Sequence, residues 1–183
     1  MKGVVFDILR DMVEEKFGLE GWNILLEKAG LDGLFLSSES YPDKDMVALI
    51  TAAMDYTGKS QEELLREFGI YMVGEFYQRF PSFFENCTTL FEFLLSVDQI
   101  VHGEVLKLYP DANLPSFTYR NDVPDKLTMV YRSSRKFCYL AEGLIQGSAN
   151  HYGTGISITH DVCMHTGADA CEIMITLDEG ADG

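Results

Sequence analysis

The hydrophobic periodicity of this chain changes near residue 115, and this change limits the folds that the chain can adopt. Before it, apolar residues recur at helical spacing, as in residues 4–17 and 20–29. Four later stretches have the alternation or the composition of β-strands: residues 116–120, 127–133, 155–162 and 171–177. Helical spacing returns over residues 135–152, between the two pairs of strands. The pattern predicts an α+β fold, with a helical N-terminal part followed by elements in the order β-β-α-β-β.

Several residues in the helical part mark where helices begin or end. Gly18 is expected to end the first helix. Ser60 and Glu63 form a capping box, in which each side chain binds the backbone of the other residue, and this predicts a helix that begins at residue 61. Gly69 is expected to break that helix. Residues 88–109 are expected to form one long helix or two joined helices.

The composition excludes several functions. The 183 residues carry 14 Lys and Arg against 29 Asp and Glu, a net charge of −15, so nucleic acid and anionic membranes are not expected as partners. No run of about 18 apolar residues is present, so no membrane insertion is expected. Asp7 interrupts the N-terminal segment, so no signal peptide is expected. Four cysteines are too few for a disulfide scaffold, and we expect a cytoplasmic protein with thiols or metal ligands.

His102 is the first candidate functional residue. It lies within an apolar helical segment, with Leu95, Val105 and Leu106 at helical distances. A histidine in such a place is either a core residue satisfied by a backbone carbonyl or a metal ligand. Gly103 is unusual in a helix interior, where glycine costs about 1 kcal/mol relative to alanine. It indicates either a close approach by a ligand or a flexible point.

Tyr131, Ser133 and Arg135 are the second candidate, because alternate residues of a strand share one face. Two hydroxyls and a guanidinium group are well suited to binding carboxylates. The alternative is an ordinary solvated strand face. The chain also contains 12 Phe, 9 Tyr, 1 Trp and 8 Met residues. Such a composition indicates either an aromatic core or a large apolar pocket for a flat ligand.

Together these residues resemble the H-NOX family, the heme nitric oxide/oxygen-binding domains related to the heme domain of soluble guanylate cyclase. The resemblance covers nearly the whole chain and includes residues 1–6, Leu114-Pro115 and residues 142–144. It implies that heme b lies between the helical part and the sheet part, with His102 as the proximal iron ligand. It also implies that Pro115 presses on the porphyrin and distorts it. The residues that would hold the two heme propionates are Tyr131, Ser133 and Arg135.

The resemblance also bears on which gas is bound. Oxygen-binding members have a distal tyrosine nine positions after the first tyrosine of the motif, and here that position is Leu140. Tyr139 is adjacent, but one residue turns a helical side chain by about 100°. The other positions that resemble the distal wall are also apolar: Val5, Leu9 and Leu144. Because O2 needs a hydrogen-bond donor and NO does not, the resemblance implies an NO-selective member, while a donor such as Tyr71 or Tyr77 stays open.

The cysteines form a third candidate site. Cys163 and Cys171 flank the turn expected at residues 166–169, in a register that places them opposite each other with Cβ atoms about 4.5–5.5 Å apart. That distance suits a shared metal ion or, with adjustment, a disulfide. Cys138 on the preceding helix could reach both. Three cysteines and one histidine would form a tetrahedral site for structural zinc, whereas Cys87 looks unrelated.

Two histidines could complete this site. A regular strand would point His165 toward Cys163, whereas His160 requires a bend near Asp161. The segment over residues 160–169 also resembles a subset of bacterial H-NOX proteins that have a zinc site there. This resemblance favours His160, and zinc over free thiols. The expected ligands are Cys138, His160, Cys163 and Cys171.

The resemblance implies a heme-based NO sensor that is not an enzyme. NO, and also CO, would bind ferrous heme, and NO would break the bond between the iron and His102. The release would change the interaction with a separate histidine kinase or cyclic-di-GMP enzyme. The expected domain spans residues 1–183, with a helical distal subdomain over 1–63 and a proximal helix-and-sheet subdomain over 64–183. The alternative is a zinc and thiol redox-sensing module or a small-ligand-binding module.

Overall fold

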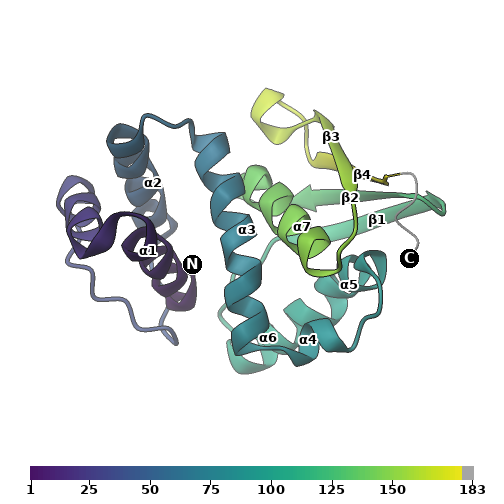
Figure 1. Cartoon of the computed structure of the whole chain (residues 1–183), viewed down its shortest axis with the longest axis horizontal. Helices are drawn as coiled ribbons and strands as arrows, with labels where there is room; N and C mark the ends of the chain where they lie inside the picture. The colour runs from purple at the N-terminus through teal and green to yellow at the C-terminus, as the bar shows by residue number, and fades with distance from the viewer. Residues whose placement is uncertain (179–183) are drawn as a thin grey trace.

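The order of helices and strands agrees with the α+β prediction in the computed structural model, which describes residues 1–178 (Figure 1). The elements before the sheet are α1 (Gly3–Ala29), α2 (Asp43–Thr57), α3 (Gln61–Arg79), α4 (Ser82–Glu85), α5 (Leu90–Ser96), the π-helical turn η1 (Val97–Val101) and α6 (His102–Leu108). The others are β1 (Ser116–Val123), β2 (Lys126–Arg132), α7 (Cys138–His151), β3 (Ile156–Val162), the 3₁₀ turn η2 (Met164–Thr166) and β4 (Cys171–Leu177). The predicted fold class is confirmed, while residues 179–183 of the expected domain lie outside the described residues.

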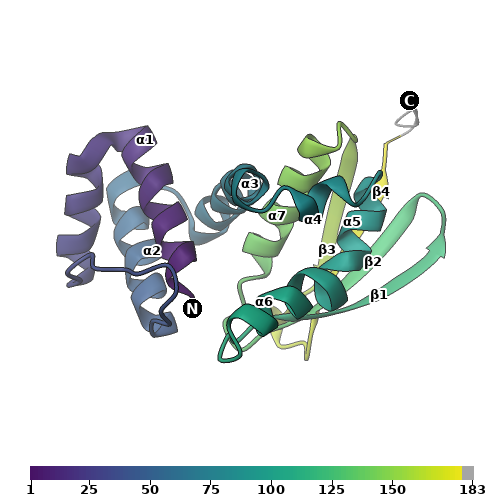
Figure 2. The same ribbon diagram turned by 90° about the horizontal axis from the view of Figure 1, so that it is seen from below.

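The four strands form one antiparallel sheet in the order β1-β2-β4-β3. Alternate residues of β2 and β4 point to the same face, because successive side chains of a strand point to opposite sides. That face packs against α5 and α7 on one side of the sheet (Figure 2). The shared core includes Leu90, Phe93, Leu94, Leu127, Met129, Ala141, Ile145, Ile173 and Ile175.

A second buried core lies in the helical N-terminal part, where α1 packs against α2. It includes Phe6, Trp22, Leu25, Met46 and Leu49. Gly18 interrupts α1 with φ 71° and ψ 176°, so the helix end predicted there is a break between two helical segments. α3 lies between this N-terminal part and the sheet (Figures 1 and 2). Among the helices of the described residues, none is both long enough and apolar enough to cross a bilayer.

The break predicted at Gly69 is wrong, because α3 continues through this residue. A Cβ atom at Gly69 would lie 2.5 Å from the carbonyl oxygen of Leu140 in α7. A Cβ atom at Gly143 of α7 would lie 2.2 Å from the carbonyl oxygen of Arg66 in α3. These glycines therefore allow the two helix backbones to cross in close contact, and the tertiary contact explains a residue that local propensity disfavours.

Candidate functional site

His102 is the first residue of α6 and directly follows the π-helical turn η1. None of the residues described in η1 and α6 is buried. The two elements nevertheless carry many apolar side chains: Val97, Ile100, Val101, Val105, Leu106 and Leu108. Ile100 and Leu108 are 58% and 68% exposed. Because apolar surface of this kind commonly marks a ligand or partner site, the segment around His102 has the character of one wall of such a site.

The His102 ring itself is mostly buried, with 16% of the side chain exposed. Its Nδ1 lies 4.0 Å from Oδ1 of Asp98, and the same oxygen accepts a hydrogen bond from the backbone N–H of Phe117 at 2.8 Å. Burial lowers the pKa of His102, although the nearby Asp98 carboxylate opposes this shift. The ring is therefore neutral at pH 7, which is the form that ligates a metal ion.

The expected strand face of the second candidate is only partly present. β2 ends one residue after Tyr131, and in the turn that follows the backbone N–H of Lys136 donates to the carbonyl oxygen of Ser133 at 3.1 Å. The prediction that strand alternation extends to Ser133 and Arg135 is therefore wrong. Tyr131 is buried, and its hydroxyl accepts a hydrogen bond from the backbone N–H of Phe137 at 3.0 Å.

The turn places the Arg135 guanidinium group against a carboxylate. Nε of Arg135 lies 2.8 Å from Oδ1 of Asp43 at the start of α2, and the Arg135 side chain is 9% exposed. Burial would raise the pKa of Asp43, but Arg135 and the N-terminal amine lower it overall. Nη1 of Arg135 donates to the carbonyl oxygen of Asn113. The group therefore already binds an anionic oxygen, which is the chemistry that a heme propionate requires.

The apolar residues expected on the distal side converge from two helices. Val5 and Leu9 of α1 and Leu140 and Leu144 of α7 pack against one cluster of buried residues: Ile8, Met12, Phe68 and Met72. The sequence analysis did not single out Phe68 and Met72, which lie on α3 one helical turn apart. Their i, i+4 spacing in the sequence indicates that the two side chains share one face of a helix. With a neutral imidazole and a carboxylate-binding turn also present, the residues fit the heme that the resemblance implies.

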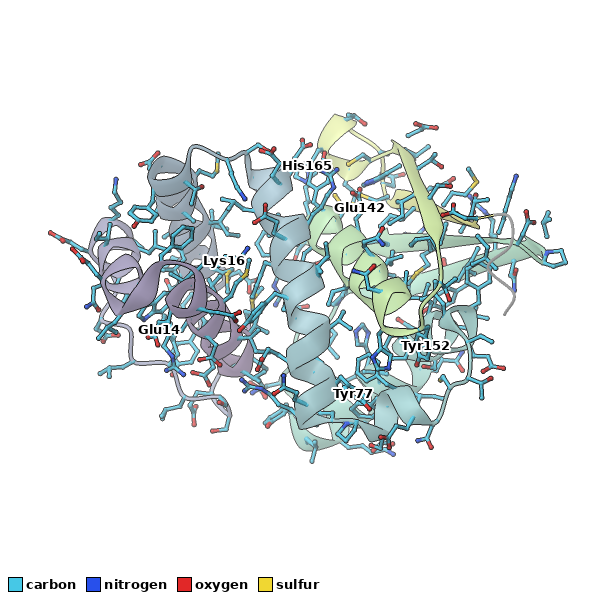
Figure 3. All side chains as sticks on the ribbon, viewed as in Figure 1. Glu14, Lys16, Tyr77, Glu142, Tyr152 and His165 are labelled. Atoms are coloured by element: carbon cyan, nitrogen blue, oxygen red, sulfur yellow. The ribbon has the colours of Figure 1, made fainter. Side chains whose placement is uncertain are left out.

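The three tyrosines considered as gas-binding donors have other partners. Tyr139 stacks on His165 with ring centroids 5.6 Å apart and lies 4.8 Å from the Arg66 guanidinium group. The rings of Tyr77 and His151 pack together with centroids 4.5 Å apart. Tyr77 lies at one end of α3, and His165 lies near the other end (Figure 3). Burial and a hydrogen bond with Glu15 raise the pKa of Tyr71 to about 12. Tyr71 packs against the same buried cluster as the four distal residues, and its hydroxyl hydrogen-bonds with Glu15.

The cysteine cluster has the dimensions of a tetrahedral metal site. Sγ of Cys163 lies 3.8 Å from Sγ of both Cys138 and Cys171. Zn–S bonds of about 2.3 Å in a tetrahedron would place two sulfur atoms about 3.8 Å apart. The ligand atoms of the three cysteines and His160 all lie within 4.8 Å of one another. Burial raises the pKa of Cys138 and of Cys171, so a bound cation would displace their protons.

An irregularity in β3 brings His160 to this cluster. Thr159 pairs with Met174 and Val162 pairs with Glu172, so β3 has one more residue than β4 between these pairs. The extra residue is a β-bulge, which turns the side chains that follow it. This is the bend that the His160 assignment requires. His165 instead binds the carbonyl oxygen of Lys136 through Nε2 at 2.8 Å.

His160 is held by a buried carboxylate that the sequence analysis did not assign to this cluster. Nδ1 of His160 lies 2.5 Å from Oε1 of Glu142, and Nε of Arg66 lies 2.6 Å from Oε2 of the same carboxylate. Burial would raise the pKa of Glu142, but hydrogen bonds with His160 and Arg66 lower it overall. Glu142 is therefore ionised and accepts both hydrogen bonds. No local sequence pattern links these three residues, which come from α7, α3 and β3.

Comparison with known proteins gives the context for this geometry. A model of the haem-NO-binding family matches residues 2–160. An H-NOX protein from S. oneidensis in the Fe(II)NO state is 30% identical, with a TM-score of 0.93 over 98% of this chain and 100% of that chain. Fe(II) unliganded H-NOX from K. algicida is 28% identical, with a TM-score of 0.90 and 98% of each chain covered. No curated protein matches.

Proposed function

This chain belongs to the haem-NO-binding family, and from that premise we propose that it senses NO through a heme ligated by His102. Membership of the family makes the chain a heme-based gas sensor. The observation that supports the proposed site is the place of His102, whose side chain is 16% exposed, on a segment where the apolar Ile100 and Leu108 are 58% and 68% exposed. Heme b would cover this segment, as would be expected of a large, flat apolar group.

The chain supplies both the iron ligand and the groups that orient the heme. His102 would ligate the iron, while Arg135, Ser133 and Tyr131 would bind the propionates and set the orientation of the ring. Pro115, which is half-buried just before β1, presses on the porphyrin. A ferrous heme held by these residues would supply an iron atom that binds a diatomic gas. Arg135 would then share its guanidinium group between a propionate and Asp43.

The distal residues favour NO and CO over O2. Bound O2 carries partial negative charge and is stabilised by a hydrogen-bond donor. The described distal wall has apolar side chains at its four proposed positions: Val5, Leu9, Leu140 and Leu144. NO binds ferrous iron tightly without such a donor. These four positions therefore offer O2 no hydrogen bond, and the Tyr71 hydroxyl, on a residue that packs against the same cluster, is already bonded with Glu15.

The signal would pass through α6 to a separate protein. Release of His102 on NO binding would free α6 to move, since none of the described residues of η1 and α6 is fully buried. Relief of the contact at Pro115 lets the distal subdomain, residues 1–63, rotate against residues 64–183. A histidine kinase or a cyclic-di-GMP enzyme reads the new surface. The net charge of −15 suits a basic patch on that partner. In this proposal the chain acts as a sensor and not as an enzyme.

An anaerobic absorption spectrum of the ferrous chain tests the proposal. We expect one broad Soret band for iron with His102 as its only axial ligand. NO should shift this band to shorter wavelength as His102 is released, and air should produce no stable O2 spectrum. Sharp split bands in air would contradict NO selectivity. The absence of any heme band after reconstitution would contradict the heme site itself.

We propose a second function for the cysteine cluster, namely zinc binding with a redox response. The support for it is the spacing of the sulfur atoms, 3.8 Å for each of the two pairs, together with His160. The four cysteines of the chain are free thiols, which suits the reducing cytoplasm. A peroxide would oxidise one thiolate to sulfenic acid, which condenses with a second thiol to a disulfide and water, and the zinc would be released. The sheet end of the molecule would then loosen.

Substitution of one thiol tests the zinc site. Cys163→Ser should lower the zinc content of the purified chain from about one ion to a small fraction, because Cys163 contacts both other sulfur atoms. Cys87→Ser is the matched control, since Cys87 lies outside the cluster and its loss should leave zinc unchanged. Zinc is measured by elemental analysis after dialysis. Equal zinc in wild type and Cys163→Ser would contradict the site.

A further inference from the structure

Glu142 connects the proposed metal site to a helix that supplies none of the four ligands. Its carboxylate lies between Arg66 of α3 and His160 of β3, at 2.6 Å and 2.5 Å respectively. The Glu142 and His160 side chains are 7% and 8% exposed. A buried carboxylate with two hydrogen-bonded cationic or N–H partners is held in one orientation. Glu142 is therefore a rigid link between α3 and β3.

The geometry of the helix crossing explains why this link forms. Gly143 follows Glu142, and a Cβ atom there would lie 2.2 Å from the carbonyl oxygen of Arg66. The backbones of α3 and α7 are thus in direct contact at the residues that carry the ion pair. A groove of about 440 Å³ beside them is lined by Arg66, Ile70, Glu142, Gly143, Gln146, Ile158 and His160. The groove reaches His160 from the α3 side, while the three cysteines are almost fully buried.

The hydrogen bond to Glu142 determines which nitrogen of His160 can bind a metal. Nδ1 lies 2.5 Å from Oε1 of the Glu142 carboxylate, so Nε2 is the ring nitrogen that is left available to a metal ion. Nε2 is buried and has no hydrogen-bond partner among the described residues. A buried nitrogen without a partner is costly unless it binds a ligand. The ring is therefore prepared to bind a cation through Nε2.

We propose that Glu142 is the positioning residue of the metal site and that Arg66 holds Glu142 in place, so that α3 belongs to the site. This inference rests on the proposed zinc function. Partners that hydrogen-bond to a ligating histidine fix its ring orientation and raise its basicity. Zinc binding consequently stabilises the contact between α3 and α7. The same helix carries Phe68 and Met72 of the distal cluster, so the metal supports the wall on which the gas site depends.

Zinc affinity of the full chain tests this inference. Glu142→Gln should weaken zinc binding by about 10- to 100-fold, because the neutral amide orients and polarises His160 less well. Arg66→Met should weaken it in the same direction by a smaller factor. Gln146→Ala is the matched control, since Gln146 lines the same groove and its side chain bonds Asn150. The metal-free variants are titrated with Zn²⁺ against a chromophoric chelator, with Cys163→Ser measured in parallel.

Two further measurements separate positioning from a general loss of stability. Cobalt bound to Glu142→Gln should keep the thiolate-to-metal absorption of wild type, which shows that the three sulfur ligands remain. The midpoint temperature of thermal unfolding, measured without metal, should fall by equal amounts from the wild-type value in Glu142→Gln and Arg66→Met. Wild-type zinc affinity in Glu142→Gln, with binding lost in Cys163→Ser, would overturn this inference and leave the zinc site standing. A wild-type chain that binds no zinc would overturn the zinc site, and this inference with it.

Discussion

His102→Gly should markedly weaken heme binding by the ferrous chain. The imidazole is the only iron ligand that the proposal assigns to the protein, and it is mostly buried, with 16% of the side chain exposed. Loss of this bond should weaken heme affinity by at least about tenfold, or about 1.4 kcal/mol. Absorbance titration of the metal-free chain with heme under anaerobic conditions measures the effect.

Free imidazole gives this experiment its decisive control. It should enter the space left by His102 and restore the ferrous spectrum at roughly millimolar concentration, because the tether that kept the ring at high local concentration is gone. The restored protein should bind NO without any change in α6, since no covalent connection joins the iron to the helix. The matched control is Gln99→Gly, because Gln99 is exposed in η1. This substitution should lower helix stability by a similar amount, about 1 kcal/mol. Equal loss of heme in Gln99→Gly would assign the effect to helix stability and not to the ligand.

Leu140→Tyr should give the chain measurable O2 affinity. Leu140 packs with Val5 and Leu144 in the proposed distal wall, where a hydroxyl would meet the gas. A hydrogen bond to a partly charged acceptor contributes about 1.5–3 kcal/mol, which is roughly a tenfold to hundredfold gain in affinity. The larger ring costs about 1–3 kcal/mol of stability by overpacking. Spectra of the ferrous variant at increasing O2 pressure measure the affinity.

Leu140→Phe separates the hydroxyl from the size of the ring. Phenylalanine overpacks the same cluster but donates no hydrogen bond, so it should bind O2 no better than wild type. Tyr139→Phe is a second control, because Tyr139 faces His165 and Arg66 and not the distal cluster. Equal O2 binding by Leu140→Tyr and Leu140→Phe would contradict the assignment of Leu140 to the gas site.

Much of the fold was predictable because short-range patterns specify it. The capping box at Ser60 and Glu63 marks the start of α3 in the structure as it does in the sequence. The break predicted at Gly69 was wrong because helix propensity alone does not account for the close crossing of α3 with α7. Alternation also failed after Tyr131, where β2 ends and a turn begins. In both places a tertiary contact or a turn overrides the periodic pattern.

Local patterns and motifs were enough to predict the fold class, the family, the proposed heme-binding residues and the four proposed zinc ligands, but not the roles of Glu142 and Arg66. Those properties follow from local periodicity and from motifs whose members are close in the chain. Tertiary packing brings Cys138 to Cys163 across 25 positions and Arg66 to Glu142 across 76. It also decided that Arg135 pairs with Asp43. Such contacts depend on how closely helices cross and where a strand bulges, and packing sets both only when the whole core forms.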